Sequence, residues 1–194
     1  LPVQAINYTP PIGVIVIVDS SGSMSEADNK GVTLLEGAKA GAIACLDAMG
    51  DKDYMGLMTL DSTYGVVLQP TPVTQRKVIE RAINGIEGPG GGTVFGGALK
   101  KAGEELQQIK SYVSKLHVII VTDGRPGDQP EDYEDIIKSN YDDNGITLSI
   151  IGIGVAKNSD IAEQMQAAVD AVGTDDVDKK GRLYLPSDAA QLIM

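Results

Sequence analysis

The sequence predicts an α/β fold: a doubly wound, mostly parallel six-stranded sheet with one antiparallel edge strand and helices on both faces. Continuous apolar runs rich in β-branched residues, at 12–18 and 116–121, are typical of strands buried on both faces. Segments with apolar residues at helical spacing stand between such runs, which implies parallel strands joined by right-handed crossovers. One tight turn at 61–63 breaks this alternation and predicts a hairpin, hence one antiparallel strand at an edge.

The first half of the chain begins with residues 1–11, which contain prolines and lack periodicity, so we expect an extended lead-in before a single domain at 12–194. The expected elements are a strand at 12–18, a helix at 31–49, the hairpin strands 54–60 and 64–68, and a helix at 72–86. Pro72 suits the first turn of that helix, because the first helical residue needs no N–H donor.

The second half opens with a glycine-rich loop at 88–92, which is too flexible for a helix or a strand. The elements expected after it are a helix at 94–109, a strand at 116–121, a helix at 131–140, a strand at 146–153, a helix at 161–172 and a strand at 182–185. Ser187 is expected to cap a closing helix.

Composition narrows the classes of function. The 194 residues carry a formal net charge of −11 with 16 basic residues, which argues against nucleic acid as a partner. No apolar run approaches the roughly 18 residues of a membrane span, so this chain is not expected to insert into a membrane. Cys45 is the only cysteine and lies in an apolar helical pattern, as a core residue would. The chain begins at Leu1 without a signal-peptide pattern, and we expect it to be a piece of a longer protein.

Oxygen donors follow two of the predicted strands. Asp19, Ser21 and Ser23 come after the first strand, and Asp123 comes after the strand at 116–121. In doubly wound folds the ligand site lies beyond the carboxyl ends of the strands, where the strand order reverses. Thr93 follows the glycine loop; taken alone, it reads more simply as a helix N-cap. Two carboxylates and three hydroxyls without nearby histidine or cysteine predict one Mg²⁺ ion, or Mn²⁺, rather than zinc or copper.

The pattern Asp19-x-Ser21-x-Ser23, then Thr93, then Asp123, resembles the metal-ion-dependent adhesion site (MIDAS) of von Willebrand factor type A domains. The resemblance implies that Ser21 and Ser23 bind the metal directly and that Thr93 binds directly or through water. It also implies that Asp19 and Asp123 mainly hold metal-bound waters. The remaining coordination position would take an Asp or Glu carboxylate from a protein partner. The expected function is therefore metal-dependent protein binding, and not catalysis.

A second resemblance concerns the parent protein. The opening Leu1-Pro-Val-Gln, followed by Pro10-Pro11, is similar to the lead-in of such domains in large bacterial membrane proteins. Those proteins carry the domain beside a glutamine-amidotransferase-like fold. This resemblance implies the extracytoplasmic part of a membrane-anchored bacterial protein.

Two other functions remain open. In one, the metal only staples loops together. In the other, the chain is a phosphatase of the haloacid dehalogenase type, which also has an aspartate after its first strand. That class needs a second aspartate as general acid where this chain has Ser21.

Of the remaining polar residues, His117 is expected in the core or at a strand edge. The acidic residues Asp128, Glu131, Asp132, Glu134 and Asp135 are expected on a solvated helix start.

Overall fold

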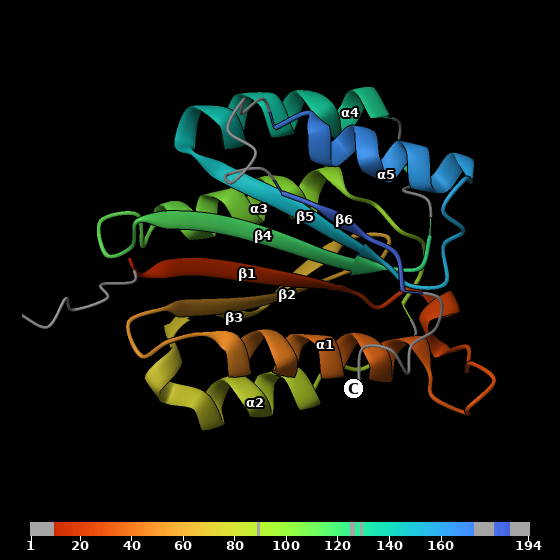
Figure 1. Cartoon of the computed structure of the whole chain (residues 1–194), viewed down its shortest axis with the longest axis horizontal. Coiled ribbons are helices and arrows are strands. Elements are labelled where there is room, and N and C mark those ends of the chain that lie inside the picture. The colour runs from red at the N-terminus through yellow and green to blue at the C-terminus, as the bar shows by residue number, and fades with distance from the viewer. Residues whose placement is uncertain (1–9, 89, 125–126, 129, 173–180, 187–194) are drawn as a thin grey trace, which may run out of the picture.

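One mixed six-stranded sheet forms the centre of the molecule, in a computed structural model that describes residues 10–88, 90–124, 127–128, 130–172 and 181–186 (Figure 1). The strand order is β3-β2-β1-β4-β5-β6, and every pairing is parallel except that of β2 with β3. The strands are β1 (Ile12–Asp19), β2 (Tyr54–Leu60), β3 (Tyr64–Pro72), β4 (Lys115–Thr122), β5 (Ile146–Gly152) and β6 (Leu183–Tyr184). The predicted fold class is confirmed, including the antiparallel edge strand.

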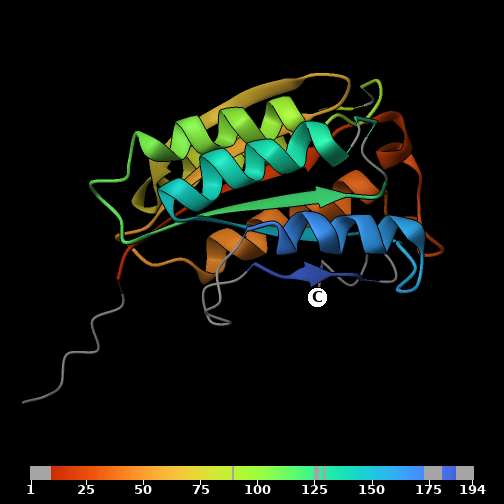
Figure 2. The ribbon, with the colours of Figure 1, turned by 90° about the horizontal axis from the view of Figure 1, so that it is seen from above.

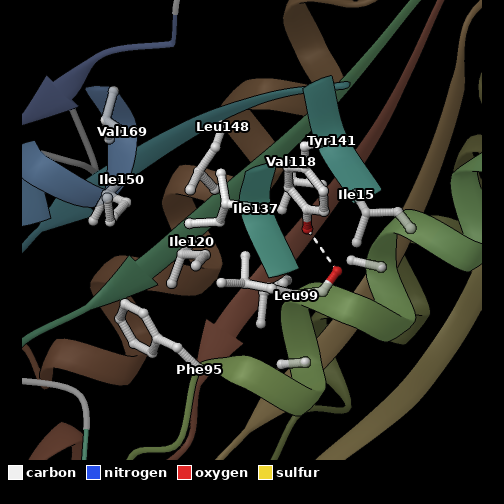
Figure 3. Packing of buried hydrophobic residues seen from close by; sticks show 14 of the residues in the cluster. Ile15, Phe95, Leu99, Val118, Ile120, Ile137, Tyr141, Leu148, Ile150 and Val169 are labelled. Atoms are coloured by element: carbon white, nitrogen blue, oxygen red, sulfur yellow. Dashed lines mark hydrogen bonds between the residues drawn. The ribbon is translucent and has the colours of Figure 1, made fainter. Parts of the chain in front are cut away.

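Helices cover both faces of the sheet (Figure 1), and Figure 2 looks down on one of these faces. On one face lie α1 (Leu34–Ala48) and α2 (Arg76–Asn84); on the other lie α3 (Gly96–Gln107), α4 (Pro130–Ile136) and α5 (Asp160–Asp170). Strand β1 contributes side chains to the hydrophobic cores on both faces of the sheet, because successive side chains of a strand point to opposite faces. Ile15 and Ile17 pack under α3, as Figure 3 shows for Ile15, whereas Val14, Val16 and Val18 pack under α1.

The ends of the helices follow local side-chain chemistry. Helix α1 begins at Leu34 rather than near Gly31, because Thr33 and Glu36 form a capping box in which each side chain accepts the other's backbone N–H. Ser159 caps α5 by accepting the N–H of Ala162.

The prediction around Pro72 is wrong. Strand β3 continues from Tyr64 through Pro72, which pairs with Tyr54, and the following helix begins only after it as a 3₁₀ turn, η2 (Val73–Gln75). Proline is tolerated here because β3 is an edge strand, where an outward-facing position needs no N–H donor. The end of an edge strand was therefore mistaken for the first turn of a helix.

Helix α4 does not continue as a regular helix to the predicted end near Asn140. It changes into a π-helical turn, η3 (Ile137–Tyr141), followed by a 3₁₀ turn, η4 (Asp142–Asn144). Tyr141 is fully buried at this irregular turn, and its hydroxyl donates to the carbonyl oxygen of Leu99 in α3 at 2.7 Å (Figure 3). The buried hydroxyl thereby ties the irregular turn to the helix that begins beside the glycine loop.

The strand order reverses direction between β1 and β4. From β1 the chain moves outward to β2 and β3, and from β4 it moves outward on the other side to β5 and β6. The carboxyl ends of these two adjacent strands therefore meet where a doubly wound fold binds ligands. In the part of the chain that is described, no helix is both long and apolar enough to cross a membrane. Residues 1–9 of the predicted lead-in at 1–11, and the predicted Ser187 cap, lie outside the described residues.

Candidate metal centre

Asp19, the last residue of β1, is completely buried. Its Oδ1 accepts the backbone N–H of Ser21 at 2.8 Å, and its Oδ2 accepts the hydroxyl of Thr122 in β4 at 2.6 Å. Burial raises the pKa of Asp19 above its usual value, although the hydrogen bonds from Ser21 and Thr122 oppose the shift. These hydrogen bonds hold the carboxylate between the two central strands. A cation bound nearby would stabilise the ionised form of this buried carboxylate.

The two serines lie on the loop that follows β1. Ser21 is buried and stands at the N-cap position of a short 3₁₀ helix, η1 (Gly22–Ser25), but its hydroxyl does not cap that helix. That hydroxyl lies 3.3 Å from the Ser23 hydroxyl, which donates to Oδ1 of Asp123 at 3.0 Å. Met24 is buried at 1% exposure and anchors η1, while Ser23 beside it is exposed. The hydroxyls therefore connect the end of β1 with the residue after β4, at the molecular surface.

The glycine loop approaches the same place. Gly90 donates its N–H to the carbonyl oxygen of Ser20 at 2.6 Å, and Gly92 donates to the Ser62 hydroxyl at 2.7 Å. Thr93 follows directly and is half-buried. The structure thus brings the Thr93 loop against the β1 loop, but within the described residues the Thr93 hydroxyl makes no hydrogen bond with the other four predicted site residues.

The alternative interpretation of Thr93 as a helix N-cap fails. The N-cap residue of α3 is Phe95, and no side chain of its own segment caps the helix. Instead Asp128, from the loop after β4, accepts the N–H of Phe95 at 3.0 Å and that of Gly96 at 2.7 Å. The Thr93 hydroxyl is therefore not used for capping.

The donor chemistry fits a hard divalent cation. Neighbouring ligands of an octahedral Mg²⁺ with bonds of about 2.0–2.1 Å stand about 2.9 Å apart. The observed separations, 3.3 Å for Ser21–Ser23 and 3.0 Å for Ser23–Asp123, are close to that spacing. Among the described residues, no group of three or more His, Cys, Asp or Glu side chains could hold a metal. Hydroxyls supplemented by two carboxylates are thus the donor set that this edge of the sheet offers.

Sequence reasoning missed two polar contacts. Thr122 was given no role, although a hydroxyl just before Asp123 at the end of a buried strand was a usable signal. Asp128 was assigned to a solvated helix start. Its hydrogen bond with Gly96 of α3 joins residues 32 positions apart in the chain, and no local sequence pattern reveals such a contact. His117 lies partly buried on β4 with its Nδ1 2.5 Å from the Thr147 hydroxyl, and burial lowers the pKa of His117 to about 4.

Several known proteins share this architecture. An uncharacterised protein of Synechocystis sp. is 23% identical over 158 residues, 81% of this chain and 36% of that protein, so the chain spans about a third of that relative. A von Willebrand factor type A structure from Catenulispora acidiphila superposes with a TM-score of 0.73 at 21% identity, covering 95% of this chain and 40% of that one.

Two further structures are similar in fold. The pilus adhesin SpaC from Lactobacillus rhamnosus GG has a TM-score of 0.72 at 17% identity, with 95% and 29% of the two chains covered. An aerotolerance-related membrane protein from Bacteroides fragilis has a TM-score of 0.71 at 16% identity, with 93% and 94% covered. Residues 14–125, more than half of the chain, match the von Willebrand factor type A domain family; the match begins at the third residue of β1 and ends two residues after Asp123. The chain therefore belongs to the von Willebrand factor type A domain family.

Proposed function

We propose that this domain binds one Mg²⁺ or Mn²⁺ ion and uses it to capture an Asp or Glu carboxylate of a protein partner. Ser21, Ser23 and Thr93 would hold the ion, with Asp19 and Asp123 orienting its waters. The observation that carries the proposal is the connected set of oxygens from Ser21 through Ser23 to Asp123, at spacings close to an octahedral edge. Membership of a family whose domains commonly mediate interaction and adhesion agrees with it.

The exposure of the site supports partner binding over a purely internal role. Asp19 is buried, Asp123 is half-buried, and Ser23 is exposed. The Asp19 carboxylate is thus withdrawn from the surface, and the neutral hydroxyl of Ser23 is the donor most exposed to solvent. A cation held by neutral hydroxyls keeps more of its positive charge than one held by carboxylates, so an incoming carboxylate completes both its charge and its coordination.

The loop-staple alternative has less support, because direct hydrogen bonds already hold these loops together. The Ser20 carbonyl oxygen accepts the N–H of Gly90, and the Ser23 hydroxyl donates to Asp123. The phosphatase alternative has none from this site, because Ser21 stands where the general acid would be needed. We therefore propose that the domain is not an enzyme.

The names of two similar structures bear on where the protein works. One is a pilus adhesin and another is an aerotolerance-related membrane protein. We propose on this ground that the chain belongs to the extracytoplasmic part of a membrane-anchored bacterial protein.

Calorimetric titration of chelator-treated protein with Mg²⁺ and Mn²⁺ tests the site. We expect binding with a stoichiometry of about one, lost in Ser23→Ala. Ser25→Ala is the matched control, because the Ser25 hydroxyl lies on the same short helix but donates to the Gly22 carbonyl oxygen. Absence of heat in the unmodified protein, or equal loss in both variants, contradicts the proposed site.

A pull-down from the native source, with and without chelator, tests the partner. A partner released by chelator and regained with Mg²⁺ supports carboxylate capture. A partner retained fully in chelator indicates that the metal only staples loops. Metal-dependent hydrolysis of a phosphate ester, measured alongside, indicates the phosphatase.

A further inference from the structure

We propose that Asp128 is a positioning residue, which sets the place of Thr93 relative to Asp123 and so tunes metal affinity without touching the metal. This inference rests on the proposed metal site. Asp128 is half-buried and follows Asp123 by five residues on the loop after β4. Its carboxylate reaches across to the start of α3, immediately after Thr93.

The contacts hold Thr93 from both sides. Gly127 donates its N–H to the carbonyl oxygen of Thr93, and Asp128 accepts the N–H groups of the second and third residues after it, Phe95 and Gly96. On the opposite side, Val94 donates its N–H to the carbonyl oxygen of Asp61 at 2.9 Å. These hydrogen bonds from other segments therefore fix the backbone around Thr93. The Thr93 side chain itself makes no hydrogen bond within the described residues.

Two glycines make this approach possible. A Cβ on Gly127 would lie 3.0 Å from the Thr93 carbonyl oxygen, and a Cβ on Gly96 would lie 3.1 Å from Oδ2 of Asp128. Both distances are shorter than ordinary van der Waals contacts. The loop after β4 can therefore lie against the Thr93 segment only because both of these positions are glycine, which has no Cβ. The fit leaves little freedom for Thr93 to shift relative to that loop.

The arrangement couples two separate parts of the site. The same short loop carries Asp123 at its beginning and the Thr93 contacts at its end. Displacement of the α3 start would therefore change the position of Thr93 relative to Ser23 and Asp123. Residues that orient metal ligands from outside typically change metal affinity by about 10–100-fold when substituted.

The test measures Mg²⁺ affinity by calorimetry for Asp128→Ala and Asp128→Asn. We expect about a 10-fold loss for Asp128→Ala. A smaller loss is expected for Asp128→Asn, because its single carbonyl oxygen still accepts one of the two N–H groups. Glu131→Gln is the matched control, since it removes one exposed negative charge from the neighbouring helix α4 and should bind as the unmodified protein does.

A double-mutant cycle with Thr93→Ala distinguishes positioning from general destabilisation. If Asp128 acts through Thr93, Asp128→Ala adds no further loss of affinity in the Thr93→Ala background. Amide exchange at Phe95 and Gly96 should also quicken in Asp128→Ala, in chelator as well as in Mg²⁺. Gly127→Ala, which presses on the Thr93 carbonyl, should weaken Mg²⁺ binding in the same direction.

The outcomes separate this inference from the proposed function. If the unmodified protein does not bind Mg²⁺, the metal site itself is wrong and the positioning role is lost with it. If it binds but Asp128→Ala and Asp128→Asn bind equally well, the site stands and Asp128 is only a helix cap. Additive losses in the cycle, or an equal loss in Glu131→Gln, likewise overturn the inference. An Asp128→Ala protein that does not fold leaves Asp128→Asn and Gly127→Ala to decide.

Discussion

Substitution of Asp19 by asparagine should make the metal-free domain more stable and the metal-loaded domain less stable than the unmodified protein. Asp19 is fully buried, and burial raises its pKa, so its ionised form is disfavoured in the folded state without a cation. Asparagine has the same shape. Its oxygen can still accept the Ser21 N–H, and its amide can donate to the Thr122 hydroxyl, which serves as an acceptor equally well.

The expected magnitudes follow from opposing effects. Removing an uncompensated buried charge while keeping its hydrogen bonds should raise the free energy of unfolding by about 1–2 kcal/mol in chelator. For a domain of this length that corresponds to an increase in Tm of about 2–8 °C. Mg²⁺ at about 100 times its Kd should stabilise the unmodified protein by about 2.7 kcal/mol and the variant hardly at all. The metal effect is the larger one, so the order of stability should reverse on adding Mg²⁺.

Thermal unfolding followed by circular dichroism, in chelator and across a Mg²⁺ series, measures both effects. Asp51→Asn, at an exposed aspartate, is the control and should leave both curves nearly unchanged. The reasoning is refuted if Asp19→Asn lowers Tm in chelator, which would show that the charge itself stabilises the fold. It is equally refuted if the variant retains the full Mg²⁺-dependent increase in Tm.

Three further predictions concern single side chains. Below pH 6.5 the unfolded chain protonates His117 but the folded chain does not until about pH 4, so the free energy of unfolding should fall over this window by up to about 3 kcal/mol. His117→Gln should reduce that fall in urea titrations; an unchanged pH profile would show that His117 charges freely. Tyr141→Phe should cost about 1 kcal/mol, because it removes the buried hydrogen bond from the Tyr141 hydroxyl to the Leu99 carbonyl oxygen, and a urea midpoint equal to that of the unmodified protein would contradict this. Thr93→Ala should weaken Mg²⁺ and partner binding while changing Tm in chelator by less than about 2 °C, since its hydroxyl makes no hydrogen bond within the described residues; a large fall in Tm would make Thr93 structural.

Much of the architecture was readable in the linear chain, because strands buried on both faces carry a strong periodic signal. The apolar runs at 12–18 and 116–121 predicted two buried parallel strands, and polar residues after each run marked the edge where the strands meet. The hairpin at 61–63 also predicted the antiparallel edge strand, whereas the order of the strands across the sheet came only from the structure. The residue types in Asp19, Ser21, Ser23, Thr93 and Asp123 were sufficient to predict a hard-cation site, and this site remains a prediction.

Tertiary structure decided what depends on neighbours distant in the chain. Pro72 is a strand residue because it pairs with Tyr54 of β2, a contact that the residues around Pro72 do not reveal. Asp19 is buried, with Thr122 as its donor 103 residues away, and only the packing of β4 against β1 makes that contact. Thr93 is not a helix cap because Asp128 arrives from another loop and takes both free N–H groups. Periodicity and residue type are local properties and are carried by the sequence itself, whereas hydrogen-bond partners and desolvation are set by groups that only folding brings together.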